Sequence, residues 1–463
     1  MKTLSAYKHI HCIGIGGIGL SAIAEILLSR GHRVSGSDMK DSDIAQKLRK
    51  AGAEVYIGHE ASQVGDADLV IYSAAISPEN PERKYAEERG IETVSRAQAL
   101  GSLMAECKES IAVSGTHGKT TTTSMISLLL EHAKLDPTIL VGGNLAEIDG
   151  NVKVGGHDYF VTEACEYMDS FLSLRPRTEI ILNIDSDHLD YFKDIDHIVR
   201  SFDTFAHLVP EDGLVIAYAA NPFVSRIVEN LSCRVLTFGF NDKCDYYADN
   251  IQFNSLGMPA FDLCFRGEVL CHLQLSVPGE HNIANALAAA ACARTLGVSV
   301  DVISSTLETY TGTQRRFDVI GVTGSDVRVV DDYGHHPTEI KATLSAAANI
   351  PHKNLWCIFQ PHTYTRTLAL FKDFAQAFDG ADKLILADIY AAREKNIYKI
   401  SSKELATEIK NTHPGKEVYY FADFDEIANF VLNNSEPRDL VITMGAGDIY
   451  KVAEMILEKD RRK

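Results

Sequence analysis

The sequence predicts an α/β protein whose sheets are mostly parallel and are built from repeated strand–helix units. Short apolar runs alternate with helical patterns along most of the chain, which is typical of βαβ units. The length of 463 residues corresponds to about three domains of usual size. Two glycine-rich segments each stand between a strand and a helix, the place where parallel sheets bind phosphate groups.

The first region carries a glycine signature. Apolar runs predict strands over residues 9–15, 33–37, 69–73 and 92–94, with a helix over 21–30. Gly14, Gly16 and Gly19 satisfy GxGxxG directly after the first strand, and Asp38 ends the next one. Such a turn presents backbone amides to a diphosphate at a helix N-terminus. The motif fits NAD, FAD or a UDP-sugar, and it also occurs where a strand merely packs tightly on its helix.

The second region opens with a phosphate-binding loop. GTHGKTTT at 115–122 follows the apolar run 111–113 and precedes a helical pattern over 124–132. Lys119 is placed to reach the β- and γ-phosphates of a nucleotide, and the Thr120 hydroxyl is placed to ligate Mg²⁺. The loop is a shortened GxxGKT, because Val113 stands where the general GxxxxGK[ST] pattern has its first glycine. Its position between a strand and a helix still favours a nucleotide site.

Charged residues follow two later strands of this region. Glu163 comes after the run 158–161, and His188 lies among carboxylates just after the run 179–184. Ligands of open α/β sheets bind at such strand ends. Thr120 and Glu163 offer the oxygen ligands that Mg²⁺ prefers, whereas His188 is a less usual ligand for it. Zinc is an alternative for the segment 185–190, although no matching second pair of ligands appears.

The remaining pattern continues the strand–helix alternation. A strand is predicted over 214–218, an alanine-rich helix over 282–296, and further strands over 327–330, 356–360, 383–387 and 439–444. Asn282 and Asn285 are one turn apart and therefore share a face of that helix.

Composition excludes several functional classes. The formal net charge of −18 argues against nucleic-acid binding. Nine cysteines without a CxxC pair predict buried thiols in a reducing compartment. No apolar run approaches the ~18 residues of a membrane span. We expect a cytoplasmic protein that contacts neither nucleic acid nor membrane.

Several motifs together resemble the ATP-dependent Mur ligases of bacterial cell-wall synthesis. They are GTHGKTTTT at 115–123, EACE at 163–166, NIDSDHLDYF at 183–192, PGEHNIANALAA at 278–289, TGTQRRF at 311–317, DDYGHHPTE at 331–339 and FQPHTYTRT at 359–367. The resemblance covers essentially the whole chain, and the shortened phosphate loop is normal in this family. It implies a Rossmann-like UDP-sugar-binding domain over 1–108, a central P-loop ATPase domain over 109–314 and a Rossmann-like amino-acid-binding domain over 315–463.

The resemblance also implies roles for individual residues. The residues implied for the UDP-sugar are Gly14, Gly16, Gly17, Gly19, Asp38 and Ser73. Those implied for ATP are Gly115, Thr116, His117, Gly118, Lys119, Thr120, Thr121, His281, Asn282, Asn285, Arg316 and Asp332. Lys119, Glu163 and His188 would be catalytic. Thr120 and Glu163 would hold one Mg²⁺, and His188 would complete a second metal site beside Glu163. His335 and Arg366 would position the amino acid.

The last two motifs narrow the resemblance to members that join L-alanine to the lactyl carboxylate of UDP-N-acetylmuramate. The implied reaction consumes ATP with Mg²⁺ and passes through an acyl phosphate, in a monomer or weak homodimer. Two positions depart from relatives: Thr363 stands where some have a second arginine, and Asp203 where other ligases carry a carbamylated lysine. His188, His335 and a carboxylate are all candidates for the base that takes the amine proton.

Three alternatives stay open. A recycling ligase that adds a tripeptide to the same sugar nucleotide shares most motifs and differs mainly around His335 and Arg366. An NAD-dependent oxidoreductase would use the first glycine loop and Asp38, but it would leave the phosphate loop at 115–122 without a task. A non-catalytic UDP-sugar sensor would not need Lys119, Glu163 and His188 together.

Overall fold

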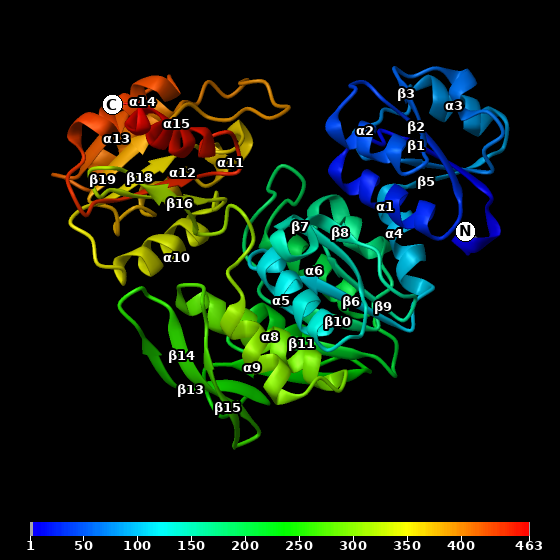
Figure 1. Cartoon of the computed structure of the whole chain (residues 1–463), viewed down its shortest axis with the longest axis horizontal. Helices are drawn as coiled ribbons and strands as arrows, with labels where there is room; N and C mark the ends of the chain where they lie inside the picture. Colours follow the sequence, from blue (N-terminus) through cyan, green and yellow to red (C-terminus); the bar gives the residue numbers. More distant parts are fainter. Residues whose placement is uncertain (1–2, 463) are drawn as a thin grey trace.

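The computed structural model describes residues 3–462 and contains three sheets, each in its own lobe (Figure 1). The N-terminal lobe (blue) and the C-terminal lobe (yellow to red) lie on either side of a central lobe (cyan to green) that joins them. The predicted three-domain α/β fold is thereby confirmed. The boundaries at 108/109 and 314/315 stay predictions.

The N-terminal sheet has the order β3-β2-β1-β4-β5, and all of its pairings are parallel. Its strands are β1 (His9–Ile13), β2 (Arg33–Asp38), β3 (Glu54–Ile57), β4 (Leu69–Tyr72) and β5 (Glu92–Ser95). Its helices are α1 (Ile18–Ser29), α2 (Asp43–Lys50), α3 (Pro81–Glu88) and α4 (Arg96–Ala105), with 3-10 turns η1 (Leu4–Ala6) and η2 (Ala61–Val64). The glycine loop lies between β1 and α1, as predicted.

The central sheet has ten strands in the order β15-β14-β13-β12-β11-β10-β6-β9-β7-β8. The strands are β6 (Glu109–Ser114), β7 (Thr138–Leu145), β8 (Gly150–Lys153), β9 (Tyr159–Glu163), β10 (Thr178–Ile181), β11 (Leu214–Tyr218), β12 (Arg234–Gly239), β13 (Tyr246–Phe253), β14 (Pro259–Phe265) and β15 (Glu268–Gln274). Pairing from β7 to β13 is parallel, while β8 and the β13–β15 meander are antiparallel. The sequence analysis did not predict these antiparallel additions.

The helices of the central lobe flank this sheet (Figure 1). They are α5 (Lys119–His132), α6 (Ile195–Ala206), α7 (Pro222–Val228), α8 (Glu280–Thr295) and α9 (Val300–Thr309), with 3-10 turns η3 (Ala146–Ile148) and η4 (Tyr167–Ser173).

The C-terminal sheet has the order β16-β17-β21-β18-β19-β20 and is parallel except at β16. Its strands are β16 (Asp318–Val322), β17 (Arg328–Asp332), β18 (Leu355–Phe359), β19 (Lys383–Leu386), β20 (Glu417–Tyr420) and β21 (Leu440–Met444). Its helices are α10 (Pro337–Ala348), α11 (Tyr364–Ala369), α12 (Phe371–Ala375), α13 (Ser402–Thr412), α14 (Phe424–Asn434) and α15 (Tyr450–Arg461). Within residues 3–462, no helix is both long and apolar enough to cross a bilayer.

Close packing of α8 on α5 fixes the position of the phosphate loop at the start of α5. All alanines of α8 except Ala284 are fully buried, and their small side chains let the two helices approach closely. Gly118 caps α5 in the left-handed region, with φ 85°. A Cβ at Gly118 would lie 2.7 Å from Oδ1 of Asn285 on α8. Glycine is therefore required there, because it adopts the positive φ angle and leaves room for Asn285. Helix α8 thus fixes the turn from which Lys119 projects.

Helix α4 connects the N-terminal lobe to the central lobe and packs on η4. Gly101 is buried at this contact, and a Cβ at that position would lie 1.9 Å from the Ser173 carbonyl oxygen. Because the neighbour is backbone, it has little freedom to move aside. The glycine therefore sets the distance between the two lobes.

We expect Gly101→Ala to destabilise the protein. Alanine gains about 0.5–1 kcal/mol over glycine in an exposed helix, but overpacking against fixed backbone typically costs about 1–3 kcal/mol. The expected net result is a lower midpoint of thermal unfolding, measured by circular dichroism. Ala105→Ser, at an exposed position of the same helix, is the control. A variant at least as stable as the wild type would contradict this packing.

Candidate active site

The phosphate loop holds its lysine in a buried ion pair. Lys119 Nζ donates to the Gly115 and Thr116 carbonyl oxygens at 2.5 and 3.1 Å and to Glu166 Oε2 at 2.9 Å. Burial lowers the pKa of Lys119, but the Glu166 carboxylate outweighs it and the pKa is raised. The lysine is therefore positively charged, and a nucleotide phosphate must compete with the Glu166 carboxylate to bind it. Glu166 was absent from the predicted site residues, although it closes the EACE motif.

The loop is also tied to the end of β10. The His117 amide donates to Asn183 Oδ1 at 2.8 Å, and Asn183 Nδ2 donates to the His117 carbonyl at 3.0 Å. The Asp185 amide donates to the Thr116 hydroxyl at 2.9 Å. Asn183 was not predicted as a site residue either. Its two bonds fix the loop before any nucleotide arrives, so less ordering is needed on binding.

Thr120 and Glu163 both lie next to β7. Glu163 Oε1 accepts a hydrogen bond of 2.6 Å from the Gly142 amide. A Cβ at the next residue, Gly143, would lie 3.1 Å from the Thr120 methyl group. The hydroxyl and the carboxylate are hard oxygen ligands of the kind that Mg²⁺ prefers, so these residues fit the predicted ion.

His188 lies on the Glu166 side of the loop. Its Nε2 is 4.0 Å from Glu166 Oε1 and 3.8 Å from Asp187 Oδ2. Its ring packs against Tyr167, with centroids 4.7 Å apart. His188 therefore approaches the carboxylate that also binds Lys119. Its predicted role as a metal ligand beside Glu163 stays a prediction.

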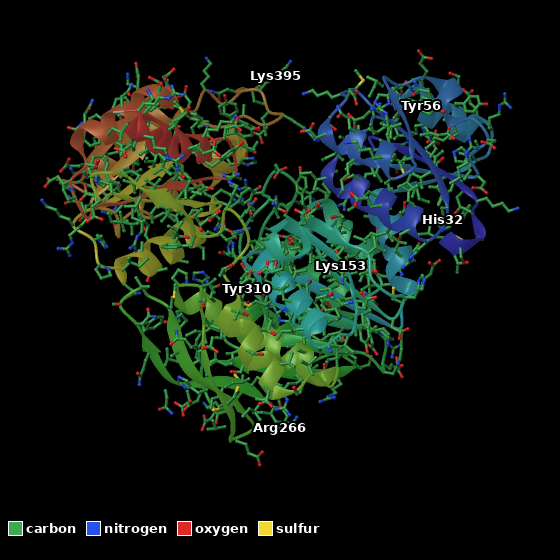
Figure 2. The ribbon with its side chains drawn as sticks, in the orientation of Figure 1. His32, Tyr56, Lys153, Arg266, Tyr310 and Lys395 are labelled. Atoms are coloured by element: carbon green, nitrogen blue, oxygen red, sulfur yellow. The ribbon has the colours of Figure 1, made fainter. Side chains whose placement is uncertain are left out.

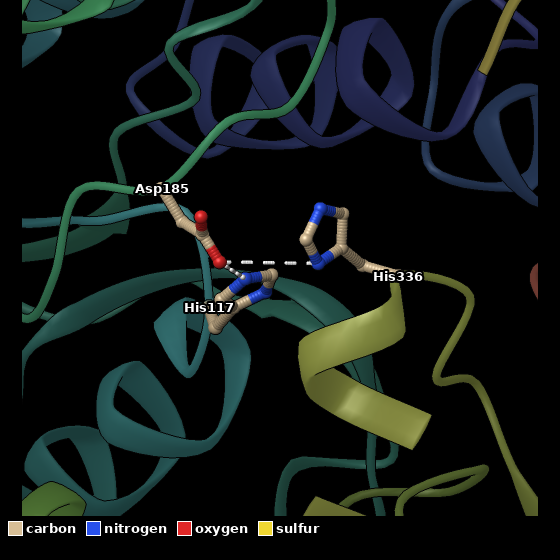
Figure 3. Close-up of side chains that lie close together, drawn as sticks. All are labelled: His117, Asp185 and His336. Carbon is tan, nitrogen blue, oxygen red and sulfur yellow. Dashed lines mark hydrogen bonds and ion pairs between the residues drawn. The ribbon is translucent and has the colours of Figure 1, made fainter. Parts of the chain in front are cut away.

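Another group of side chains lies close enough to share an ion, but its atoms are already engaged. In the described part of the chain, the possible ligand atoms of His117, Asp185 and His336 lie within 4.8 Å of one another (Figure 3). His336 Nε2 bonds to the Ser186 carbonyl oxygen at 2.9 Å, and its Nδ1 accepts from the Thr338 amide at 3.3 Å. The Thr338 hydroxyl donates to Asp185 Oδ2 at 2.8 Å. We interpret the group as a contact between the central and C-terminal lobes.

His117 bridges two carboxylates across this contact. Its Nε2 is 3.2 Å from Asp185 Oδ2, and its Nδ1 is 3.4 Å from Glu339 Oε1 on α10. Burial lowers the pKa of His117, but the hydrogen bonds to Asp185 and Glu339 outweigh it and raise the pKa to about 9. The loop thus presents a second cation, and this one touches the C-terminal lobe.

A cavity of about 530 Å³ lies between the phosphate loop, α8 and the C-terminal lobe. The predicted ATP residues that line it are His117, Gly118, Thr121, His281, Asn282, Asn285, Arg316 and Asp332. Tyr218, Phe238 and Phe240 add an aromatic wall suited to a flat base. Asn285 Nδ2 donates to Asn282 Oδ1 at 3.0 Å, which confirms that the two side chains share a helix face. The shape and donors suit a nucleotide beside the phosphate loop.

The Asp332 carboxylate organises the C-terminal wall of that cavity. It accepts hydrogen bonds from the amides of Phe317 at 2.8 Å and Gly334 at 2.7 Å. Burial raises its pKa to about 6. Arg316 lies nearby, with its NH1 3.8 Å from Glu339 Oε1.

A larger cavity of about 960 Å³ runs from the N-terminal glycine loop to Glu163. The predicted UDP-sugar residues that line it are Gly14, Gly17, Gly19, Asp38 and Ser73. Asp38 Oδ2 also accepts from the Gly16 amide at 3.0 Å, so this aspartate orders the loop itself. His59 and Arg96 line the cavity as well and were not predicted. No short motif marks either of them, since each meets the glycine loop only through folding.

Arg366 binds Asp187 of the central lobe, and the charge of Asp187 also acts on His335. Arg366 Nε donates to Asp187 Oδ1 at 2.9 Å. Burial raises the pKa of Asp187, but the Arg366 guanidinium holds it well below its usual range. Burial lowers the pKa of His335 to about 4, so this imidazole is neutral near pH 7 and could accept a proton. The structure thus gathers the two predicted amino-acid-binding residues at one place.

Not every cysteine is buried as predicted. All nine are free thiols, but Cys165 is exposed and Cys271 is partly exposed. Cys165 lines the larger cavity next to Glu163, which explains its access to solvent.

We expect the charge on His117 to stabilise the protein in a defined pH window. Its pKa is raised from 6.5 to about 9, so the stabilisation is fully present below pH 6.5 and is lost as the pH rises through about 9. The shift of about 2.5 pKa units corresponds to at most about 3.4 kcal/mol, at about 1.36 kcal/mol per unit. His117→Gln should therefore lower the unfolding midpoint most at pH 6 and least at pH 10. His157→Gln, at an exposed position, is the control. A pH-independent difference would contradict the bridge.

Three family models match the chain in order. "Mur ligase family, catalytic domain" matches residues 9–108, "Mur ligase middle domain" residues 113–293 and "Mur ligase, glutamate ligase domain" residues 315–447. Together they span most of the chain.

Similar proteins and structures agree with these matches. The UDP-N-acetylmuramate–L-alanine ligase of Alkaliphilus metalliredigens is 51% identical over 451 residues, 97% of each chain. That of Caldanaerobacter subterraneus is 50% identical over 459 residues, 99% of each. The UDP-N-acetylmuramate-alanine ligase structure from Thermotoga maritima has a TM-score of 0.80 at 29% identity, covering 98% of this chain and 99% of its own. A murein peptide ligase from Psychrobacter arcticus has a TM-score of 0.71 at 26% identity, covering 98% of both.

Proposed function

The chain belongs to the Mur ligase family, and we propose that it joins L-alanine to the lactyl carboxylate of UDP-N-acetylmuramate at the expense of ATP. Relatives about 50% identical over nearly their full length carry this activity in their names. The observation that carries the proposal is the pair of cavities, one suited to a nucleotide and the other running from a diphosphate-binding loop to Glu163. Two phosphorylated substrates have separate places beside one set of charged residues.

The first step forms an acyl phosphate. A carboxylate oxygen of the sugar nucleotide attacks the γ-phosphorus of ATP, and the bond to the ADP oxygen breaks. The two anions repel, so the site must supply positive charge and fixed dipoles. Lys119 supplies the charge by exchanging Glu166 for phosphate oxygens, and the amides of the phosphate loop supply the dipoles. Mg²⁺ held by Thr120 and Glu163 would neutralise further phosphate charge.

The second step forms the amide. The neutral amine of L-alanine attacks the acyl carbon, the carbon–oxygen bond to phosphate breaks, and the amine proton passes to a base. Water would hydrolyse the acyl phosphate, so the C-terminal lobe must cover it. Arg366 and His335 lie on that lobe at its contact with Asp187, and we assign them to the incoming amino acid. His335 is neutral, and His188 lies beside Glu166 and Asp187. Both histidines therefore stay candidates for the base that takes the amine proton.

The proposed function also bears on where the protein is located in the cell and on its oligomeric state. ATP and the sugar nucleotide are cytoplasmic metabolites, and all nine cysteines are free, so we place the enzyme in the cytoplasm. We propose no nucleic-acid or membrane partner, and a monomer or weak homodimer stays a prediction.

The direct test is phosphate release from ATP and Mg²⁺ with UDP-N-acetylmuramate and one of three additions. These are L-alanine, the tripeptide L-Ala-D-Glu-diamino acid, or no amine. We expect release that requires L-alanine and a product heavier by one alanyl residue. Release with the tripeptide alone would assign the chain to the recycling reaction. No release with any amine would contradict ligase function.

We expect Lys119→Gln to lower kcat by about 100-fold or more, the usual scale for losing a group that stabilises developing charge. Circular dichroism must show a folded variant, because Glu166 loses its buried partner. Lys108→Ala, at an exposed position before β6, is the control and should keep wild-type turnover. A Lys119→Gln enzyme within threefold of the wild type would exclude the lysine from the chemistry.

A further inference from the structure

The loop between β19 and α13, residues 387–401, extends from the C-terminal lobe toward the N-terminal lobe (Figure 1). One of its side chains, Arg393, lines the cavity that runs from the glycine loop to Glu163. The other lining residues all come from positions 14–174. The C-terminal lobe therefore contributes a single cation to a cavity otherwise built by the other two lobes.

The base of this loop is fixed firmly. The Thr363 amide donates to the Tyr390 carbonyl oxygen at 2.9 Å, and the Tyr390 amide donates to the Pro361 carbonyl at 2.8 Å. Glu394 accepts from the Thr365 amide at 2.9 Å and also from the Thr365 hydroxyl, at the start of α11. The residue after Arg393 is thus anchored to the helix that carries Arg366.

The turn that presents Arg393 has an unusual backbone. The Glu394 amide donates to the Ala391 carbonyl at 2.9 Å, closing a turn with Ala392 and Arg393 at its centre. Ala392 has φ 51°, in the left-handed region that alanine rarely adopts. Such a conformation persists when the surroundings enforce it, and it often occurs at functional sites. Here it directs the chain so that Arg393 faces the cavity.

Arg393 has no partner of its own. Within residues 3–462 its guanidinium makes no hydrogen bond or ion pair, unlike the neighbouring Glu394. The positive charge of Arg393 acts on the Tyr167 hydroxyl, where it favours a lower pKa, and the ring of Tyr167 packs on His188. An unpaired guanidinium that lines the same cavity as Glu163 is a ready ligand for a carboxylate or a phosphate.

We propose that Arg393 binds an oxyanion of the sugar nucleotide when the C-terminal lobe closes over the cavity. This inference rests on the proposed function and adds a residue to its substrate site. The diphosphate and the lactyl carboxylate offer the same chemistry, and both are negatively charged at neutral pH. In a chain of net charge −18, Arg393 adds to Arg96 a second cation that lines the cavity and can attract either group.

The test compares Arg393→Ala with Lys395→Ala. Both variants remove one positive charge from the same loop, and Lys395 lies exposed on its extended part (Figure 2). Calorimetry with the non-hydrolysable ATP analogue AMP-PNP present gives dissociation constants for UDP-N-acetylmuramate, UDP-N-acetylglucosamine and UDP. We expect Arg393→Ala to weaken UDP-N-acetylmuramate binding by about tenfold or more, the scale of a charge-assisted hydrogen bond, and Lys395→Ala to change it less than twofold.

The other two ligands identify the oxyanion. UDP-N-acetylglucosamine and UDP lack the lactyl carboxylate, so a loss confined to UDP-N-acetylmuramate assigns Arg393 to that carboxylate. An equal loss for all three assigns it to the diphosphate. Arg393→Lys should recover part of the affinity, and the affinity for AMP-PNP should stay unchanged, because Arg393 does not line the nucleotide cavity.

A binding constant for UDP-N-acetylmuramate within twofold of wild type in Arg393→Ala would overturn the proposal. So would an equal loss in Lys395→Ala, since it would show only a general charge effect. These binding measurements need no turnover. A wild-type protein that binds the sugar nucleotide but does not ligate L-alanine would refute the proposed function and leave the test of Arg393 intact.

Discussion

The segment after β10 is the part of the molecule on which the active site depends. On one side, Asn183 and Asp185 bond to the phosphate loop. On the other, Asp185 and Asp187 bond to Thr338 and Arg366 of the C-terminal lobe. Breaking a buried ion pair by removing one partner typically costs about 3–5 kcal/mol. A few carboxylates therefore hold the third lobe in the position where it completes the nucleotide cavity.

This arrangement links nucleotide binding to the position of the lobes. His117 belongs to the phosphate loop, yet it also contacts Glu339 on α10. Lys119 is paired with Glu166, and Glu166 in turn lies 4.0 Å from His188. A nucleotide phosphate that draws Lys119 away would leave Glu166 free to interact with His188 or a metal ion. Nucleotide binding would thus rearrange the charges around the loop, which suits a reaction that must wait for both substrates.

The sequence predicted the strand–helix order, because local patterns determine it, and the resemblance supplied part of the residues that line the two cavities. GxGxxG and GTHGKT each lie in the predicted strand–turn–helix context, and the alanine-rich helix at 282–296 packs on α5. Individual roles within the site still rest on the resemblance, as for the metal-binding role of His188. Glu166, Asn183 and Arg393 were missed because their importance arises from partners or cavities formed by distant parts of the chain. The β13–β15 meander was missed because its short strands lack the regular apolar runs of the parallel core.

We propose that the two cavities serve one reaction in which ATP activates the sugar carboxylate. The most direct measurement uses UDP-N-acetylmuramate labelled with ¹⁸O in its lactyl carboxylate, turned over with ATP, Mg²⁺ and L-alanine. Transfer through an acyl phosphate predicts one ¹⁸O atom in each molecule of inorganic phosphate released, as read by mass spectrometry. Phosphate free of label, with the ¹⁸O atom that the carboxylate loses found in water instead, would contradict activation of the carboxylate by transfer of the γ-phosphate of ATP.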